Sequence, residues 1–367
     1  MSPLNPRPSS DAPLKRILVF RIGHLGDTLV AIPAFATLRR HFPNARISLL
    51  TNNDRRNPHY VGAQSVLPAD GLFDGHIDYP SNGPTSIADF ARLLIELRNG
   101  SFDAVVYLMT RNRTPRQIAR DRFFFRLAGI KRFLCGDHLL RNRLDFDMPR
   151  PLPRVQSESD FLLECLASEG IVDSCNEHGK TRIYTYKDSS IAENWLRRRC
   201  GEAFTNRKLV AVAPGSKWES KIWEESRFRD VISHLIEKES IFPVIFGGKE
   251  DRGVGARLIS SWGVGANAAG DFNVRESAAA LAHCRLYLGN DTGTMHLAAS
   301  AGVRCVAVFA AVDFDGRWYP VGDGHTIFRE SVPCEGCSSA HCPNQKLCLD
   351  MVKEDEVLQA CLRTLQD

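Results

Sequence analysis

The alternation of short apolar runs with amphipathic stretches constrains this chain most. Residues 15–20 (KRILVF), 46–51 and 103–109 are rich in strand-forming residues, while residues 27–42 and 85–98 carry apolar residues at helical spacing. Strands that alternate with helices predict a parallel sheet covered by helices on both faces. We therefore expect an α/β fold.

The alternation begins afresh in the second half. Residues 208–213 (KLVAVA), 242–246 (FPVIF) and 304–309 (RCVAVF) are predicted strands, with helices expected between them. Two such series predict two Rossmann-like domains that face each other. Because ligands bind at the carboxyl ends of parallel strands, we expect the site in a cleft between the domains.

The predicted boundaries follow from these two series and from the polar segment that separates them. We expect a disordered tail over residues 1–14, an N-terminal domain over 15–170, a linker over 171–207, a C-terminal domain over 208–350 and a C-terminal helix over 351–367.

Composition excludes several classes of protein. A hydrophobic content of 43% and a charged content of 25% are typical of a soluble globular protein. No run approaches the roughly 18–20 apolar residues that span a bilayer. The net charge of +4 is too small to indicate a nucleic-acid partner. We expect a cytoplasmic protein.

Six arginines are concentrated within sixteen residues. One interpretation is a solvated helix face, and the other is a site for an acidic small molecule or a membrane-lipid headgroup. The cluster consists of Arg111, Arg113, Arg116, Arg120, Arg122 and Arg126.

Four of the eleven cysteines lie close together in the sequence. Cys334, Cys337, Cys342 and Cys348 have the spacing C-x2-C-x4-C-x5-C, which is compact enough for a structural zinc or iron ion or an iron–sulfur site. The alternative is a set of reduced thiols or a redox-sensitive pair.

The loop after the first predicted strand contains Gly23, Gly26 and Asp27. The two glycines can adopt backbone angles that other residues avoid and let a ligand approach closely, and Asp27 is suited to cap the following helix. A phosphate cradle, a helix cap and a carboxylate placed for chemistry are all compatible with this loop.

Two loops of the second half are candidate phosphate sites. Ser216 and Lys221 offer a hydroxyl and a positive charge that can hold a phosphate without metal, although an ordinary turn with a surface lysine has the same pattern. Residues 289–296 place glycines and a carboxylate before a predicted helix start, which suits a pyrophosphate. The residues expected to contribute there are Asp291, Thr292, Gly293 and His296, the last as a hydrogen-bond donor to a phosphate oxygen or as a structural histidine.

A third loop follows the predicted strand at residues 242–246. Glu250 and Asp251 are placed to accept hydrogen bonds from ribose hydroxyls. Together the loops predict a nucleotide site in the second domain that faces Asp27. A carboxylate within reach of an acceptor hydroxyl can act as a general base.

These motifs resemble glycosyltransferase family 9, the heptosyltransferases of lipopolysaccharide assembly. The match consists of R-x-G-x-L-G-D-x5-P from Arg21 to Pro33, PGS…K-x-W from Pro214 to Trp223, and G-N-D-T-G-x-x-H from Gly289 to His296. The resemblance covers roughly residues 15–350, and the cysteine cluster looks like one seen in many members.

The resemblance implies a GT-B fold and an inverting glycosyltransferase (EC 2.4 class) that needs no metal for catalysis. Asp27 matches the aspartate thought to deprotonate the acceptor. Ser216 and Lys221 match residues at the donor diphosphate, and the loop from Asp291 to His296 matches the donor-binding loop.

The reaction expected from the resemblance moves a sugar, most simply heptose from ADP-heptose, onto a lipopolysaccharide or other cell-surface glycan. Gly23, Gly26, Arg111 and Arg113 are the expected acceptor contacts. A lipid-linked acceptor would bring the protein into peripheral contact with the inner face of the cytoplasmic membrane. Two alternatives are a nucleotide-sugar epimerase on the same fold and a non-catalytic sugar-nucleotide-binding protein.

Overall fold

The computed structural model describes residues 13–53, 61–67, 71–80, 86–173 and 182–366. The chain divides into two compact units. Unit 1 consists of Met1–Phe146 and Glu158–Thr181, and unit 2 consists of Asp147–Ser157 and Arg182–Asp367.

Unit 1 contains a five-stranded sheet in the order β3-β2-β1-β4-β5, and all its strand pairs are parallel. Strands β1 and β4 are buried along almost their whole length, as expected for a sheet covered on both faces. The strands are β1 (Arg16–Phe20), β2 (Arg46–Asn53), β3 (Gly75–Pro80), β4 (Ala104–Tyr107) and β5 (Arg132–Leu134).

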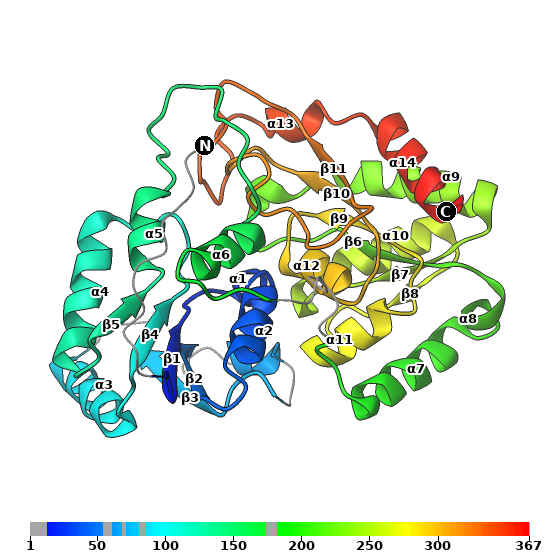
Figure 1. Cartoon of the computed structure of the whole chain (residues 1–367). Helices are drawn as coiled ribbons and strands as arrows, with labels where there is room; N and C mark the ends of the chain where they lie inside the picture. Colours follow the sequence, from blue (N-terminus) through cyan, green and yellow to red (C-terminus); the bar gives the residue numbers. More distant parts are fainter. Residues whose placement is uncertain (1–12, 54–60, 68–70, 81–85, 174–181, 367) are drawn as a thin grey trace. The chain divides into compact units, whose positions relative to one another are not determined.

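Helices cover both faces of this sheet (Figure 1). Helix α2 (Ile32–His41) packs against α6 (Glu158–Ala167), while α3 (Ile87–Gly100) and α4 (Pro115–Leu127) lie on the opposite face. Aromatic rings fill the space beneath α4, where Phe125 meets Phe20 of β1 at 5.2 Å. The remaining helices of unit 1 are α1 (Leu25–Leu29), η1 (Ala63–Ser65) and α5 (Gly136–Arg141).

Unit 2 contains a six-stranded sheet in the order β11-β10-β9-β6-β7-β8, again with parallel pairs. Its core is built from Val, Ile and Leu residues of the strands together with apolar side chains of α9 and α14. The strands are β6 (Leu209–Ala213), β7 (Phe242–Ile245), β8 (Ala266–Asn267), β9 (Leu286–Asn290), β10 (Cys305–Phe309) and β11 (Thr326–Arg329).

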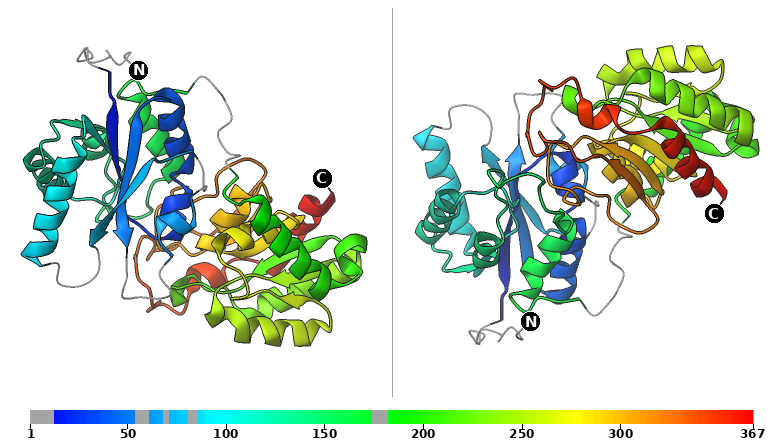
Figure 2. Two further views of the ribbon diagram at one scale, coloured as in Figure 1. Left: turned by 90° about the horizontal axis from the view of Figure 1, so that it is seen from below. Right: turned by 90° about the horizontal axis from the view of Figure 1, so that it is seen from above.

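Two helical layers cover this second sheet (Figure 2). Contacts join α9 to α10 and α14 in one layer, and α11 to α7 and α12 in the other. The helices are α7 (Tyr186–Cys200), α8 (Ala203–Asn206), η2 (Glu219–Lys221), α9 (Glu225–Glu239), η3 (Lys249–Asp251), α10 (Arg252–Trp262), α11 (Val274–Leu281), α12 (Gly293–Ser300), α13 (Leu347–Asp350) and α14 (Glu354–Gln366).

Both sheets confirm the predicted α/β fold, and they place two segments differently from the predicted boundaries. The segment expected as a linker contains α7, which packs onto unit 2: the Trp195 ring lies 5.0 Å from Phe272, and its indole N–H donates to Asp271 at 3.1 Å. The polar composition of α7 hid this contact, because only one side of the helix is buried.

Residues 147–157 also belong to unit 2 rather than to the first domain. The Arg150 guanidinium donates to the carbonyl oxygen of Glu335 at 2.7 Å, and the Leu152 amide donates to the Glu335 carboxylate. Glu335 is only 1% exposed, so the segment is tied to the interior of unit 2. Contacts across about 180 positions leave no local trace in the sequence.

Both sheets have a point at which the strand order changes direction. In unit 1 the change lies between β1 and β4, and in unit 2 between β6 and β9. Ligands of open α/β sheets bind outside the carboxyl ends of the strands at such points. The loop with Asp27 follows β1, while the loops with Ser216 and Asp291 follow β6 and β9, so each lies at its unit's switch point.

Candidate functional site

Asp27 is fixed at the switch point of unit 1 by its own helix start. Helix α1 begins at Leu25, two residues earlier than expected, and the Asp27 carboxylate accepts a hydrogen bond from the His24 amide at 2.8 Å. The helix expected to continue unbroken to residue 42 ends at Leu29, and α2 starts at Ile32 with Pro33 in its first turn. Asp27 therefore caps α1 from within, with 20% of its side chain exposed.

Gly23 makes room for that carboxylate. A Cβ atom at Gly23 would lie 2.2 Å from the Cβ of Asp27 and 2.8 Å from its Oδ2. Neither Gly23 nor Gly26 has a positive φ, so the predicted reason for these glycines, unusual backbone angles, is wrong. The Gly23 amide is anchored by a 2.9 Å hydrogen bond to Oδ1 of Asn52.

Arg21 is a buried support of this loop that the sequence analysis did not single out as a site residue. Its side chain is 1% exposed and donates to the main-chain carbonyl oxygens of Asp27 at 2.8 Å and Leu108 at 2.9 Å. These bonds join the ends of β1 and β4. Nη2 of Arg21 also lies 3.9 Å from Oδ1 of Asp27, which places a positive charge beneath the carboxylate.

The two predicted acceptor arginines differ in their surroundings. Arg111 is 3% exposed, and its Nε donates to Glu158 at 3.2 Å while the guanidinium lies over the Phe161 ring. This buried ion pair joins the end of β4 to α6. Arg113 is half-buried in the next turn. The acceptor role of both residues stays a prediction.

Lys221 and Asp291 meet at the switch point of unit 2. The Nζ of Lys221 lies 2.6 Å from Oδ2 of Asp291, with 18% of the lysine side chain and 7% of the aspartate side chain exposed. The ammonium also lies 5.2 Å from the centre of the Trp218 ring. A cation that is paired on one side and partly open on the other can still meet an anionic ligand.

Asn290 ties the two predicted phosphate loops together. It is fully buried, its Oδ1 accepts from the Trp223 amide at 3.1 Å, and its Nδ2 donates to the Pro214 carbonyl oxygen at 2.8 Å. The hydrogen bonds of Asn290 therefore hold the loop after β6 and the loop after β9 together. The sequence analysis included Asn290 only as a letter of a motif, because its partners lie about 70 positions away.

The other predicted donor contacts surround this pair. The Ser216 hydroxyl accepts from the Trp218 amide at 3.3 Å, which orders the turn. Thr292 immediately precedes α12, Gly293 is its first residue, and His296 lies in its first turn with 5% exposure. Thr292 and Gly293 are partly exposed, so amides at this helix start can meet an anion.

Asp251 and Glu250 follow β7, and their side chains lie against nearby glycines. The Asp251 carboxylate accepts from the Gly248 amide at 2.9 Å and occupies the space where Cβ atoms of Gly215 and Gly247 would lie. Burial raises the pKa of Asp251 above its ordinary value. Asp251 thus packs the loops together, whereas Glu250 is exposed and bends over Gly248. The ribose contact predicted for both stays a prediction.

Tyr287 forms the floor under these loops and was not identified from the sequence. It is fully buried on β9, and its hydroxyl occupies the space beside Gly289 where a Cβ atom would lie at 2.4 Å. Burial raises the pKa of its phenol. A larger residue at Gly289 would displace this ring, which gives one physical reason for the glycine.

The four clustered cysteines lie near one another without forming a ligand set. No group of three or more His, Cys, Asp or Glu side chains among the described residues is arranged to hold a metal ion. The Sγ of Cys348 accepts from the Ala311 amide at 3.4 Å, and that of Cys342 from the Lys346 amide at 3.3 Å. Burial raises the pKa of Cys348, which favours its thiol form. The geometry does not support the predicted structural zinc or iron.

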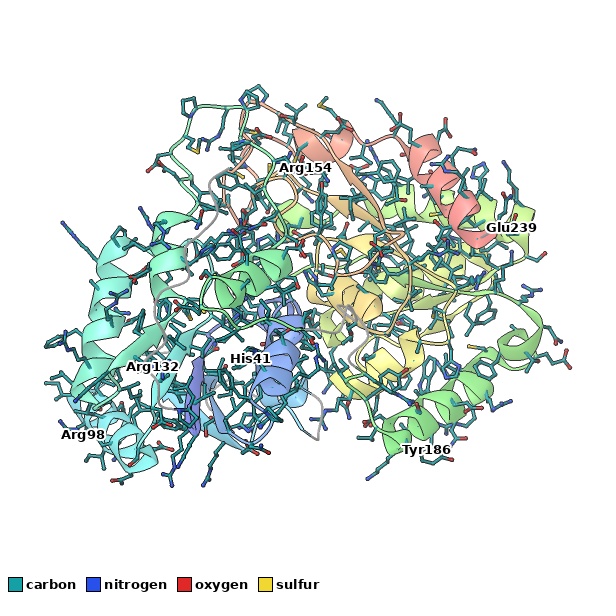
Figure 3. The ribbon with its side chains drawn as sticks, viewed as in Figure 1. His41, Arg98, Arg132, Arg154, Tyr186 and Glu239 are labelled. Atoms are coloured by element: carbon teal, nitrogen blue, oxygen red, sulfur yellow. The ribbon has the colours of Figure 1, made fainter. Side chains whose placement is uncertain are left out.

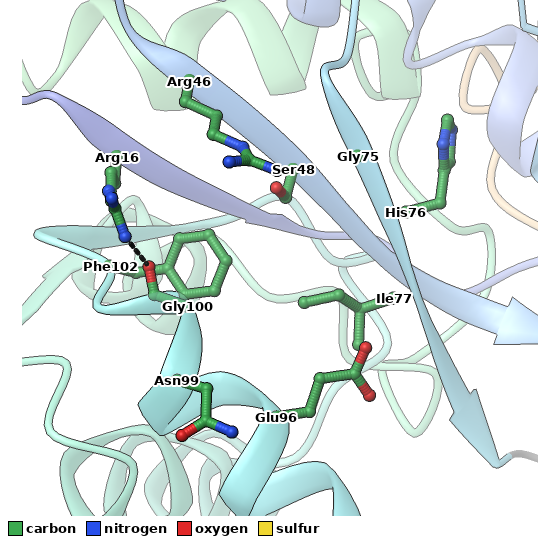
Figure 4. A pocket seen from close by; sticks show the side chains of 10 residues that line it. All are labelled: Arg16, Arg46, Ser48, Gly75, His76, Ile77, Glu96, Asn99, Gly100 and Phe102. Atoms are coloured by element: carbon green, nitrogen blue, oxygen red, sulfur yellow. Dashed lines mark hydrogen bonds between the residues drawn. The ribbon is translucent and has the colours of Figure 1, made fainter.

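A cavity of about 300 Å³ lies at the amino ends of the strands of the sheet in unit 1 (Figure 4). Its walls include Arg16 and Arg46, the first residues of β1 and β2, together with Glu96 from α3. Arg16 donates to the carbonyl oxygen of Gly100 at 3.1 Å. Because it lies at the amino ends of the strands, this cavity is separate from the loop with Asp27.

Comparison with known proteins identifies relatives that match much of the chain. The sequence model described as glycosyltransferase family 9 (heptosyltransferase) matches residues 179–348. Lipopolysaccharide heptosyltransferase 3 of Escherichia coli is 22% identical over 300 residues, which span 78% of this chain and 81% of that protein. Within the described residues, no helix is long and apolar enough to cross a membrane.

Solved structures share the fold over almost the full length. The crystal structure of a family 9 glycosyltransferase from Veillonella parvula has a TM-score of 0.73 at 21% identity and covers 96% of this chain and 97% of its own. The E. coli ADP-heptose lipopolysaccharide heptosyltransferase II has a TM-score of 0.65 at 17% identity, with 96% and 98% covered. These likenesses confirm the predicted GT-B fold.

Proposed function

We propose that this chain, a glycosyltransferase of family 9, transfers heptose from ADP-heptose to a lipopolysaccharide acceptor with inversion at the anomeric carbon. The observation that carries the proposal is the contrast between its two switch points. Unit 1 presents an oriented carboxylate, Asp27, and unit 2 presents a lysine, Lys221, beside a helix start. The names of the E. coli relatives support heptose as the sugar and ADP as the nucleotide.

In this proposal unit 2 binds the donor. The diphosphate would lie against the amides of Thr292 and Gly293 and near the ammonium of Lys221. Asp291 orients the lysine by a 2.6 Å contact, and it also lowers the net charge of the site, so the amides must supply much of the attraction. Donors fixed in advance stabilise the charge that develops on the leaving ADP.

In this proposal unit 1 activates the acceptor. The acceptor hydroxyl gives its proton to the Asp27 carboxylate, its oxygen forms a bond to the anomeric carbon, and the bond from that carbon to the diphosphate breaks. ADP leaves with the electron pair of the broken bond. The His24 amide donates to Oδ2 of Asp27 and Nη2 of Arg21 lies 3.9 Å from Oδ1, so the carboxylate is held in place to receive the proton. No step of this scheme requires a metal ion.

A thermal-shift series tests the donor. Because a ligand that binds only the folded state raises its apparent stability, ADP and ADP-heptose should raise the melting temperature more than UDP, GDP or their sugars. Equal shifts from all nucleotides, or none from ADP, would contradict the donor assignment. Nucleotide-free buffer at the same ionic strength is the control.

A product assay tests the reaction. ADP-heptose and a purified lipopolysaccharide acceptor lacking outer heptose should yield free ADP and a heavier acceptor by mass spectrometry. Incubation with ADP-heptose alone is the control: rearranged nucleotide sugar without acceptor would identify an epimerase instead. Nucleotide binding with no product in either reaction would identify a non-catalytic binding protein.

The lipid-linked acceptor also implies where the enzyme works. An acceptor anchored in the inner face of the cytoplasmic membrane would be met by a protein that lies at that face. In this proposal the protein makes peripheral contact with the membrane through unit 1, the unit assigned to the acceptor.

A further inference from the structure

Helices α3 and α4 expose large apolar side chains on the outside of unit 1. On α3, Ile87 is 90% exposed and Ile95 is 58% exposed. On α4, Phe123 is 62% exposed and Leu127 is 46% exposed. Large apolar side chains at such exposure, gathered on neighbouring helices, mark a surface that contacts something other than water.

The same side of α4 also carries arginines. Arg116, Arg120, Phe123 and Leu127 recur at helical spacing and are exposed, whereas Phe125 on the other side is buried. Arg126 is exposed next to Leu127. The helix is therefore amphipathic, with an outer stripe of two arginines in its first half and two apolar residues in its second half.

The exposed sides of α3 and α4 form one surface. The rings of Phe90 and Phe124 lie 6.0 Å apart, and the Arg98 guanidinium donates to the Leu127 carbonyl oxygen at 3.0 and 3.1 Å. Figure 3 shows side chains projecting outward from these helices, with Arg98 labelled on α3. We call this region the α3–α4 surface; it consists of Ile87, Ile95, Arg116, Arg120, Phe123, Arg126 and Leu127.

The charge of α4 and its flanking residues is almost entirely positive, whereas α3 carries Asp89 and Glu96 as well as Arg92 and Arg98. Between Arg111 and Arg132 the chain has seven arginines and one lysine against a single acidic residue, Asp121. Asp121 is 6% exposed and is engaged by the Tyr107 hydroxyl at 2.8 Å and by Arg120. Among the described residues, the guanidinium groups of Arg116 and Arg126 form no ion pair or hydrogen bond. The outer side of α4 therefore presents two guanidinium groups, those of Arg116 and Arg126, that no carboxylate of the helix neutralises.

We propose that the α3–α4 surface binds the headgroup region of a bilayer that contains anionic lipids. The apolar side chains would enter the boundary between headgroups and acyl chains, and the arginines would pair with lipid phosphates. Charge complementarity favours an anionic bilayer as the partner of this surface. Basic amphipathic helices bind such bilayers through burial of apolar side chains and electrostatic attraction to lipid phosphates. A soluble polyanion would use the arginines and leave Ile87 and Phe123 in water.

This inference rests on the proposed function for its purpose, because it would hold unit 1 where a lipid-linked acceptor is found. It does not depend on turnover for its test. Vesicle binding is measured without donor or acceptor, and transfer is measured on a detergent-dispersed acceptor without vesicles. The two assays can therefore fail separately.

Vesicle flotation with the full-length protein tests the surface. The wild type should float with vesicles of phosphatidylethanolamine and roughly one-quarter phosphatidylglycerol, and about tenfold less with phosphatidylcholine alone. Because screening weakens contacts between exposed charges, about 0.5 M NaCl should release most of the protein. Equal flotation with both vesicle types, or none with either, would overturn the proposal.

Substitutions locate the binding surface. The Phe123→Ser/Ile87→Ser and Arg116→Gln/Arg126→Gln double variants should each bind anionic vesicles roughly fivefold to tenfold less. All four side chains are exposed, so the melting temperature should stay that of the wild type. The matched control is Tyr186→Ser/Arg198→Gln on α7 of unit 2, where Tyr186 is 87% exposed; it should bind like the wild type.

Four results separate the possible outcomes. Equal vesicle binding by all variants would overturn the proposal, and so would wild-type protein that binds a soluble polyanion such as heparin and no vesicles. Reduced vesicle binding with unchanged transfer to a dispersed acceptor would support it. Normal vesicle binding by a wild type that shows no transfer would leave this inference standing and remove the proposed function.

Discussion

The switch points of the two units have the same topology and different chemistry. In unit 1 the loop after β1 carries one carboxylate, Asp27, supported from beneath by Arg21. In unit 2 the loops after β6 and β9 carry a lysine–aspartate pair and an open helix start. The comparison teaches that the fold supplies the location, whereas the side chains at each strand end decide what that location can do.

The supports of the two loops differ in the same way. Asn52 accepts a bond from Gly23 in unit 1, and Asn290 bonds both Trp223 and Pro214 in unit 2. The site in unit 2 is thus tied together across two strand ends, as a rigid anion site requires. The loop in unit 1 orients one carboxylate and leaves 20% of it exposed, as a base for an incoming hydroxyl requires.

The largest effect is expected from the Asp27→Asn substitution. Removal of a general base typically lowers kcat by about 10²–10⁴-fold, while the amide keeps the bond that His24 donates. The measurement is the rate of ADP release with acceptor present. Asp89→Asn is the control, because Asp89 caps α3 in the same way and should transfer at nearly the wild-type rate. Wild-type turnover by Asp27→Asn would remove the division of roles between the units.

The Lys221→Gln substitution should raise the KM for the nucleotide sugar and lower kcat, together by about 10–100-fold in kcat/KM. It removes a cation and also leaves Asp291, 7% exposed, as an unpaired charge beside the diphosphate. Lys221→Gln/Asp291→Asn should restore the melting temperature and not the rate. The exposed neighbour variant Lys217→Gln is the control; an equal loss in that variant would indicate a general effect of charge.

A matched pair of asparagine substitutions compares the loop supports. Asn290→Ala should lower the free energy of unfolding by about 1–3 kcal/mol, because it leaves the buried Trp223 amide without its partner. Asn52→Ala should have a smaller effect, since the Gly23 amide that it bonds is only partly buried. Urea denaturation measures both. A larger loss in Asn52→Ala would reverse the comparison.

The sequence predicted much of this architecture for a physical reason. Buried central strands and amphipathic helices leave strong local patterns, so both sheets and all three motif loops were found. The edge strands β3, β8 and β11 were missed because they are only partly buried, and β8 has just two residues. The role of Gly23 was misjudged, since a close approach by Asp27 looks the same in sequence as a need for positive φ.

Long-range polar contacts could not be predicted from the sequence. The six-arginine cluster looked uniform in sequence, yet Arg111 pairs with Glu158 in the interior while Arg116 remains exposed. The cysteine spacing suggested a metal, but it does not determine whether four thiols converge on one point. For Arg111 the deciding partner, Glu158, lies 47 positions away.

The smallest effect is expected on the pH dependence of stability, through His325 of unit 2. Burial lowers the pKa of His325 below its ordinary value of 6.5, and the Cys305 amide donates to its Nδ1 at 3.0 Å. The contribution of neutral His325 to the free energy of unfolding is complete above pH 6.5. It is lost as the pH falls through the lower pKa that His325 has in the folded state. Urea denaturation across this range should show a steeper acid loss in the wild type than in His325→Asn. Identical profiles would exclude the contribution.

Calorimetric titration of ADP into the Asp27→Asn and Lys221→Gln variants tests the central claim, that unit 2 binds the donor and unit 1 activates the acceptor. Asp27→Asn should bind ADP within about threefold of the wild type, and Lys221→Gln at least about tenfold more weakly, as expected for the loss of a charge-assisted hydrogen bond. Equal weakening in both variants, or weakening in Asp27→Asn alone, would contradict the account.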